Sequence, residues 1–188
     1  MRLIIGMAGA SGIIYGIRLL EILREVAEVE THLVMSPTAR MNASIETDMK
    51  PARIEALADV VHNVNDLAAS ISSGSFPVDG MVVAPCSMKA LSAIANSYAD
   101  NLLIRAADVT LKEARRLVLM PRETPLHAGH CKLLHEVALM GAIVAPPMPA
   151  FYNRPQTIDD IVTHSAGRVL DLFGIDPGVV KRWQGAKG

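Results

Sequence analysis

Short apolar segments alternate with amphipathic segments along almost the whole chain, and this alternation constrains the fold more than any other feature of the sequence. Residues 2–7 form the first apolar segment. After the turn at residues 9–12, apolar side chains recur at helical spacing from residue 13 to residue 23. A strand, a crossover helix and a second strand give parallel pairing. The pattern therefore predicts a parallel sheet that is covered by helices on both faces.

Further elements follow in the same order. Strands are predicted at residues 31–35, 80–85, 117–120 and 142–145, and helices after Ser36, after Ser87, at 101–114 and at 127–140. A proline-rich loop at residues 146–155 precedes the last helix. Thr157 and Asp160 match a capping box at the start of that helix, and Gly174 is placed to end it.

The order of these elements defines the expected architecture. We predict one α/β domain over residues 1–188, a three-layer doubly wound parallel sheet of the Rossmann or flavodoxin-like type. Residues 175–188 are expected to form a C-terminal tail. Residues 49–75 contain short helical pieces and no clear strand pattern.

The composition excludes several classes of protein. Hydrophobic residues make up 51% of the chain and aromatic residues 4%, with a mean hydropathy of +0.30, which suits buried strands and subunit interfaces in a homo-oligomer. No apolar run approaches the roughly 20 residues of a membrane span, and no signal peptide is expected. Cys86 and Cys131 give no disulfide framework, which indicates a cytoplasmic protein. A net charge of −1 argues against a nucleic-acid partner.

Ligands of doubly wound sheets bind at the carboxyl ends of the strands. This rule selects residues 9–12, Ser36, residues 86–89, Arg122 and the loop at 146–155. The small residues at 9–12 expose backbone N–H groups at the start of a helix, where a phosphate or another anion binds. Ligand binding and a purely structural role both remain possible at this point. The loop could be a simple tight turn, and Ser36 and Ser87 could be simple helix caps.

Basic residues and one tyrosine form a second candidate group. Arg105 and Lys112 are two turns apart on one helix face, and Arg122 directly follows a strand. Together with Tyr152 and Arg168, they offer guanidinium, ammonium and phenol groups that suit a phosphate monoester.

Other polar residues point to no metal site. Three histidines have approximate helical spacing, but no Asp, Glu or Cys partner fixes a metal geometry around them: His127, His130 and His135. Asp159 and Asp160 lack the second acidic pair of a magnesium-diphosphate site and are expected to serve the start of a helix. We therefore expect no bound metal.

Several short motifs share their order and spacing with a known family. They are GASG at 9–12, THLVMS at 31–36, ETD at 46–48, ISSGS at 71–75, PCSMK at 85–89, RAADV at 105–109, LKE at 111–113, PRETP at 121–125 and PAFY at 149–152. Together they resemble the UbiX-type flavin prenyltransferases over nearly the whole chain. The resemblance implies an enzyme that transfers a dimethylallyl group from dimethylallyl phosphate to N5 and C6 of reduced FMN. It also implies a dodecamer whose product, prenylated FMN, serves UbiD-type decarboxylases.

The resemblance assigns roles to individual residues. It implies FMN contacts from Gly9, Ala10, Ser11, Ser36, Ser87, Met88, Lys89, Ala90 and Arg122. It implies that dimethylallyl phosphate is bound by Arg105, Lys112, Arg122, Tyr152 and Arg168, some of them from neighbouring subunits. The expected catalytic residues are Ser11 and Glu46 in a proton relay, Glu123 as acid and base, and Lys112 beside the departing phosphate.

Both glutamates could instead have purely structural roles. Glu46 could form a local cap, and Glu123 could form a salt bridge with Arg122. Two departures from the family are visible. Ala90 stands where many members have a hydroxyl residue, and residues 65–69 contain no aromatic ring to shelter a cation. Trp183 could supply that ring if the tail folds over the site.

Two other functions remain open from the sequence. One is a flavin-dependent cysteine decarboxylase of the same broader superfamily, although Pro147-Met148-Pro149 lacks the asparagine of the substrate motif of those enzymes. The other is a non-enzymatic FMN carrier or accessory subunit of a decarboxylase, which would not need the phosphate-binding residues.

Overall fold

The computed structural model describes residues 1–185, so residues 186–188 of the predicted tail lie outside the described part. The strands are β1 (Arg2–Met7), β2 (Glu30–Met35), β3 (Val60–His62), β4 (Gly80–Cys86), β5 (Arg116–Pro121) and β6 (Ile143–Val144). The helices are α1 (Ile13–Arg24), α2 (Pro37–Glu46), α3 (Pro51–Glu55), the 3-10 turn η1 (Ser70–Ser72), α4 (Met88–Ala95), α5 (Leu102–Lys112), α6 (Ala128–Leu139) and α7 (Ile158–Asp171).

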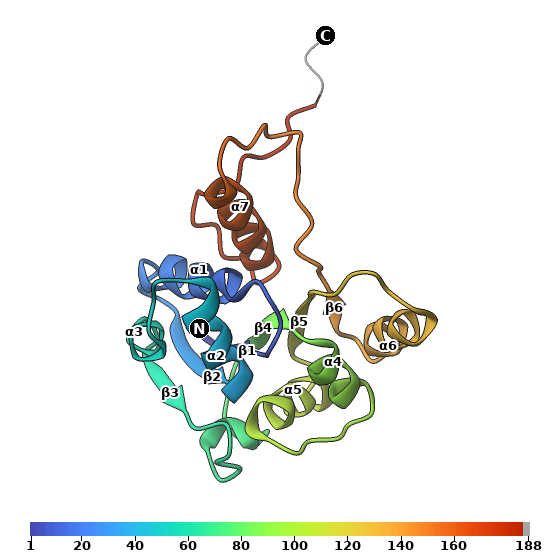
Figure 1. Cartoon of the computed structure of the whole chain (residues 1–188). Coiled ribbons are helices and arrows are strands. Elements are labelled where there is room, and N and C mark those ends of the chain that lie inside the picture. Colours follow the sequence, from blue (N-terminus) through green and yellow to red (C-terminus); the bar gives the residue numbers. More distant parts are fainter. Residues whose placement is uncertain (186–188) are drawn as a thin grey trace.

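All strand pairs are parallel, and the sheet has the order β3-β2-β1-β4-β5-β6 (Figure 1). From β1 the chain moves outward to β2 and β3, and from β4 it moves outward in the opposite direction to β5 and β6. The prediction of a doubly wound α/β sheet is confirmed, with the strand order of the Rossmann type. The point where the strand order reverses lies between β1 and β4, and the rule for such sheets places the ligand there.

Helices cover both faces of the sheet. Alternate residues of β1 point to opposite faces, so Leu3 and Ile5 belong to one buried cluster and Ile4 to the other. The first cluster packs under α1, α2, α3 and α7, and the second under α4, α5 and α6. In Figure 1, α1 and α7 lie together on one side of the sheet, and α4 and α5 lie on the other.

The predicted helix caps are present. The Oγ atoms of Ser36 and Ser87 accept hydrogen bonds from the N–H groups of Ala39 and Ala90, at 3.1 and 3.2 Å. Thr157 and Asp160 form the expected capping box of α7. After α7, Gly174 has a φ of +74°, a left-handed conformation that favours glycine at the end of a helix.

The strand β3 lies within residues 49–75, where the sequence shows no clear strand pattern, so it was not predicted. This strand has three residues and pairs only with β2, at the edge of the sheet. Val61 at its centre is 43% exposed, so β3 lacks the continuous apolar run of a buried parallel strand.

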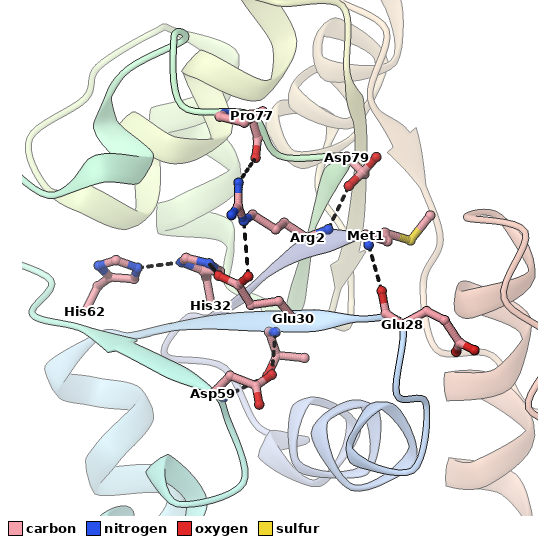
Figure 2. Close-up of polar contacts among 10 residues, drawn as sticks. Met1, Arg2, Glu28, Glu30, His32, Asp59, His62, Pro77 and Asp79 are labelled. Atoms are coloured by element: carbon pink, nitrogen blue, oxygen red, sulfur yellow. Dashed lines mark hydrogen bonds and ion pairs between the residues drawn. The ribbon is translucent and has the colours of Figure 1, made fainter.

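At the amino-terminal edge of the sheet, polar side chains link β1, β2 and β3 (Figure 2). Glu30 accepts a hydrogen bond from Arg2 Nε at 3.2 Å, and its other oxygen lies 2.8 Å from His32 Nε2. The second ring nitrogen of His32 lies 2.9 Å from His62 Nε2. Burial and the charge of His32 lower the pKa of His62 from its ordinary value. This network begins at Arg2 and Glu30, at the edge opposite to the predicted ligand site, and extends to His62 at the end of β3.

Within residues 1–185, no helix has both the length and the apolar character needed to cross a membrane.

Candidate functional site

Four strands end side by side at the carboxyl edge of the sheet, and backbone hydrogen bonds join the segments that follow them. The N–H group of Ala8 donates to Pro85 O at 3.0 Å, and that of Ser36 donates to Met7 O at 3.0 Å. The N–H group of Arg122 donates to the carbonyl oxygen of Cys86 at 3.1 Å. The segments after β1, β2, β4 and β5 therefore form one continuous rim, which contains the glycine loop, Ser36, the start of α4 and Arg122.

The glycine loop is fixed between α1 and α2. A Cβ atom on Gly9 would lie 2.4 Å from the Cβ atom of Thr38, so a larger residue does not fit without movement of α2. Asn42 of α2 donates to the carbonyl oxygen of Ala10 at 2.9 Å. Gly12 has a φ of +98°, and it turns the chain into α1. The loop exposes Ser11 at the rim.

An anion does bind the start of α1, and it is a side chain of the same protein. Glu46 Oε2 accepts hydrogen bonds from the N–H groups of Gly12 and Ile13, at 2.8 and 3.1 Å. The local capping role considered for Glu46 is therefore observed, with the carboxylate one residue away from Ser11. Its role in a proton relay remains a prediction.

Arg122 and Glu123 follow β5 directly and are both exposed. Glu123 Oε1 accepts a hydrogen bond from the N–H group of Thr124 at 3.0 Å. Among the described residues, the guanidinium of Arg122 forms no ion pair with Glu123 or with any other carboxylate. The salt bridge considered from the sequence is thus not formed, and Arg122 presents an unpaired positive charge at the rim.

Arg105 and Lys112 lie on the α5 face that packs along η1 and the serine-rich segment after it. Arg105 Nε donates to the carbonyl oxygen of Ser72 at 3.1 Å, and its Nη1 donates to Asp108 at 2.8 Å. Lys112 forms an ion pair with Glu113. Lys112 is the last residue of α5, and the chain then enters the start of β5, so this ammonium group lies toward the amino-terminal edge of the sheet.

Tyr152 and Arg168 line one cavity of about 530 Å³ at the carboxyl ends of β5 and β6. Residues of the loop that runs from β6 to α7 form one wall, and residues of α7 form another. The hydroxyl oxygen of Tyr152 lies 3.2 Å from His164 Nε2 on α7. Arg168 Nη1 lies 2.5 Å from Asp171 Oδ2. Arg168 and the hydroxyl group of Tyr152 therefore line a cavity that is partly open to solvent.

The C-terminal tail folds back toward this cavity. The ring of Trp183 meets the ring of Tyr152 edge to face, with centroids 5.7 Å apart. Arg182 binds the same carboxylate as Arg168, with Nη2 2.9 Å from Asp171 Oδ1, and this pair holds the tail against α7. The condition under which Trp183 could shelter a cation, a tail that approaches the site, is therefore met.

Comparisons with known proteins show the family to which the chain belongs. The family model named Flavoprotein matches residues 1–170. Flavin prenyltransferase UbiX of Escherichia coli (strain K12) is 57% identical over 187 residues, which cover 98% of this chain and 99% of that protein. This chain belongs to the UbiX-type flavin prenyltransferases.

Solved structures of related proteins have the same fold throughout. The crystal structure of AnUbiX (PadA1) in complex with FMN and dimethylallyl pyrophosphate is 51% identical and superposes with a TM-score of 0.97, covering 99% of this chain and 98% of that one. The dodecameric FMN-dependent UbiX-like decarboxylase from Escherichia coli O157:H7 is 54% identical, also with a TM-score of 0.97, covering 98% of this chain and 100% of that one.

The cysteine decarboxylases are more distant from this prenyltransferase. The FMN-dependent cysteine decarboxylase SpaF superposes with a TM-score of 0.64 over 78% of this chain and 83% of that one, at 18% identity. An identity this low shows a shared fold alone, so it does not support the rival activity.

The single chain of this prenyltransferase brings together part of the predicted site. The rim contains the predicted FMN residues, and the cavity beside it contains Tyr152 and Arg168. Arg105 and Lys112 form a separate group on α5. No sequence motif marks His164, although it precedes Arg168 by four residues and therefore shares its face of α7. Among the described residues, no three histidine, cysteine or acidic side chains cluster as metal ligands.

Proposed function

We propose that this chain transfers a dimethylallyl group from dimethylallyl phosphate to N5 and C6 of reduced FMN, and releases inorganic phosphate. The observation that carries the proposal is the cavity lined by Tyr152 and Arg168, beside the rim that contains Ser11 and Arg122, in a member of the flavin prenyltransferase family. The product is prenylated FMN. FMN is therefore a substrate that binds at the rim in its reduced state.

The rim fits a flavin nucleotide chemically. The residues proposed to contact it are Gly9, Ala10, Ser11, Ser36, Ser87, Met88, Lys89, Ala90 and Arg122. Small side chains at residues 9–12 allow a ring system to approach the backbone. The guanidinium of Arg122, which has no carboxylate partner among residues 1–185, suits an anionic or carbonyl oxygen. Reduced FMN supplies the nucleophilic N5 and C6 atoms when it is bound. The chain itself orients that ring and keeps water away from it.

Cationic side chains are proposed to stabilise the departing phosphate. Breaking the allylic C–O bond leaves both bonding electrons on the phosphate, so its negative charge grows in the transition state. Arg168 and Tyr152 face the cavity from the same chain, and Arg122 lies at the rim beside it. We assign Arg105 and Lys112 to the cavity of a neighbouring subunit, because α5 holds them away from the cavity of their own chain.

Proton transfer is assigned to carboxylates near the rim. Ring closure at C6 displaces one proton, which we propose passes through Ser11 to Glu46. Glu46 Oε2 is occupied by two backbone N–H groups, whereas Oε1 accepts no hydrogen bond from residues 1–185 and remains available to Ser11. Glu123 is the proposed acid and base that works with the released phosphate in the second step.

The proposed assembly is a homo-oligomer, a dodecamer like the UbiX-like decarboxylase from Escherichia coli O157:H7. Met148 and Phe151, in the loop that borders the cavity, are 75% and 73% exposed in the single chain, and burying them between subunits would be favourable.

We further propose that a UbiD-type decarboxylase receives the product. Cys86 and Cys131 are both free thiols, which supports a reducing cytoplasmic location.

One experiment tests the proposal against both alternatives. The purified protein is incubated anaerobically with reduced FMN and dimethylallyl phosphate, and the flavin is analysed by mass spectrometry. A flavin heavier by one C5 unit is expected. Unchanged FMN on a folded, flavin-binding protein would instead support an FMN carrier. Oxidative decarboxylation of a peptide with a C-terminal cysteine would support the cysteine decarboxylase.

A further inference from the structure

His164 occupies a buried position on α7 between two cavities. Its side chain lines the cavity of about 530 Å³ that contains Tyr152 and Arg168. It also lines a smaller cavity of about 120 Å³ on its other side, with Asp159 and Lys181 in the wall. The residue is 7% exposed, so its polar ring atoms need partners from the protein.

The hydroxyl group of Tyr152 is the partner that His164 meets in the larger cavity. His164 Nε2 lies 3.2 Å from this hydroxyl oxygen, and the two rings meet edge to face at 78° with centroids 5.8 Å apart. Trp183 meets the tyrosine ring at 75°. Tyr152 is 48% exposed, so these contacts fix a ring that would otherwise be free to turn into solvent.

The direction of this hydrogen bond determines what Tyr152 can bind. A phenol has one proton to donate and two lone pairs that accept, whereas the oxygens of an ionised phosphate only accept. If Tyr152 donates to His164, its proton is no longer available to a phosphate. If Nε2 carries the proton and donates to Tyr152, the hydroxyl proton is free to point into the cavity, beside Arg168.

We propose that His164 is a positioning residue that donates a hydrogen bond from Nε2 to Tyr152, so that the tyrosine hydroxyl donates to the phosphate group of the prenyl donor. This inference rests on the proposed function. It adds a residue that contacts neither flavin nor prenyl group and acts through Tyr152. His164 and Arg168 are four residues apart on α7, so one helix face orients both donors toward the same anion.

Two substitutions of similar shape separate donation from packing. Gln has a side-chain N–H group that can replace the donor, whereas Met fills a similar volume and has none. We expect His164→Met to raise the KM for dimethylallyl phosphate about tenfold, since a hydrogen bond that supports a charged partner is lost. His164→Gln is expected to recover most of that loss. Flavin affinity and the thermal unfolding midpoint should change little in either variant.

A double-mutant cycle with Tyr152→Phe makes the test specific. Without the hydroxyl group, His164→Met should cause no further rise in KM. If it raises KM equally with and without that hydroxyl, or if the Gln and Met variants behave alike, His164 acts by packing and the inference is wrong. Calorimetric titration of the same four proteins with inorganic phosphate repeats the cycle without turnover. A wild-type protein that forms no prenylated flavin would refute the proposed function, whereas the phosphate titration would still decide the inference.

A measurement on the unaltered protein covers the case in which His164→Met does not fold. The nitrogen spectrum of protein labelled with ¹⁵N-histidine distinguishes a protonated Nε2 from a bare one. The His164 signal is assigned among the six histidines by its loss in His164→Gln. A protonated Nε2 in the flavin-bound protein is expected, and a bare Nε2 would overturn the proposal.

Discussion

Glu46 Oε2 lies 2.8 Å from the backbone nitrogen of Gly12, although 34 residues separate the two in the chain. This contact closes the glycine loop with a carboxylate at the positive end of α1. It also places a base one residue away from Ser11, at the carboxyl edge of β1. A structural and a catalytic role for Glu46 are therefore compatible, and substitutions can separate them.

Glu46→Gln and Glu46→Ala are expected to differ in stability and to agree in activity. The amide oxygen of Gln can still accept from the N–H groups of Gly12 and Ile13, so the unfolding free energy should fall only slightly. Ala leaves both groups without a cap, which costs about 1 kcal/mol. Prenylated flavin formation should drop at least tenfold in both variants if Glu46 accepts a proton. Urea unfolding and single-turnover mass spectrometry provide the two measurements, and normal turnover by Glu46→Gln would restrict the residue to capping.

Lys112→Ala and Arg168→Ala should each abolish prenyl transfer and leave flavin binding intact, because both residues lie outside the rim. Their positions in the chain allow a stronger prediction. Lys112 lies toward the amino-terminal edge of the sheet, whereas Arg168 lines the cavity at the carboxyl edge. If each site takes Lys112 from one subunit and Arg168 from another, the two inactive variants can complement each other. In a mixed oligomer, some sites then combine an intact Lys112 with an intact Arg168.

Random mixing of equal amounts of these two variants should restore roughly a quarter of wild-type activity. Each of the two subunits at a site has an even chance of supplying its intact residue, so about one site in four has both Lys112 and Arg168. The two chains are coexpressed with different tags, and oligomers that contain both are isolated before assay. A mixture of Arg168→Ala with Tyr152→Phe is the matched control. Those residues share a cavity of one chain, so mixing creates no site with both side chains intact, and the activity of that mixture should not exceed the mean of its two parent variants. If the mixture of Lys112→Ala with Arg168→Ala also fails to exceed the mean of its parents, the shared site is contradicted.

Local signals in the sequence were sufficient to predict most of the fold. Buried parallel strands read as unbroken apolar runs, and Ser36 and Ser87 marked helix starts at their exact positions. The strand β3 escaped because an edge strand of three residues is only partly buried. The pairing of Glu46 with the start of α1 also escaped detection, because it depends on how α2 packs across the loop.

The sequence indicated candidate residues of the site one by one, but it did not indicate how they are arranged. The rim followed from the rule for strand ends, which needs only the order of elements. The separation of Lys112 from Arg168 depends on which end of each helix lies at the carboxyl edge of the sheet. The spacing of motifs in the sequence does not reveal this orientation. His164 carried no motif. Its importance arises from Tyr152, which reaches it through an irregular loop.

The pKa of His62 predicts a specific pH dependence of stability. Burial, followed by the charge of His32, lowers this pKa in the folded protein, although Asp66 opposes the shift. The unfolded chain therefore takes up a proton at His62 more readily, with its ordinary pKa near 6.5. Stability is complete above that value and declines as the pH falls from it toward the folded pKa.

The urea midpoint should therefore fall between pH 7.5 and pH 5.5, and His62→Gln should flatten this fall. Gln can keep a hydrogen bond to His32 Nδ1, and it does not titrate. Glu30 and Asp59 have lowered pKa values, so their contributions are lost only at more acidic pH and do not obscure this range. An unchanged slope in His62→Gln would assign the pH dependence to other groups.

Gly16 in α1 allows the helix to approach β4 beside the point where the strand order reverses. A Cβ atom at this position would lie 2.3 Å from the carbonyl oxygen of Ala84, which is backbone and cannot rotate away. Gly16→Ala should therefore reduce the unfolding free energy by about 1–3 kcal/mol, despite the better helix propensity of Ala. Gly167→Ala in α7 is the matched control, because the nearest atoms to the added methyl would be side-chain atoms of Val179 and Val180. Those side chains can shift, so the control should lose less stability. Urea unfolding of both variants measures the difference, and equal losses would show that contact with the Ala84 carbonyl is not what requires glycine in α1.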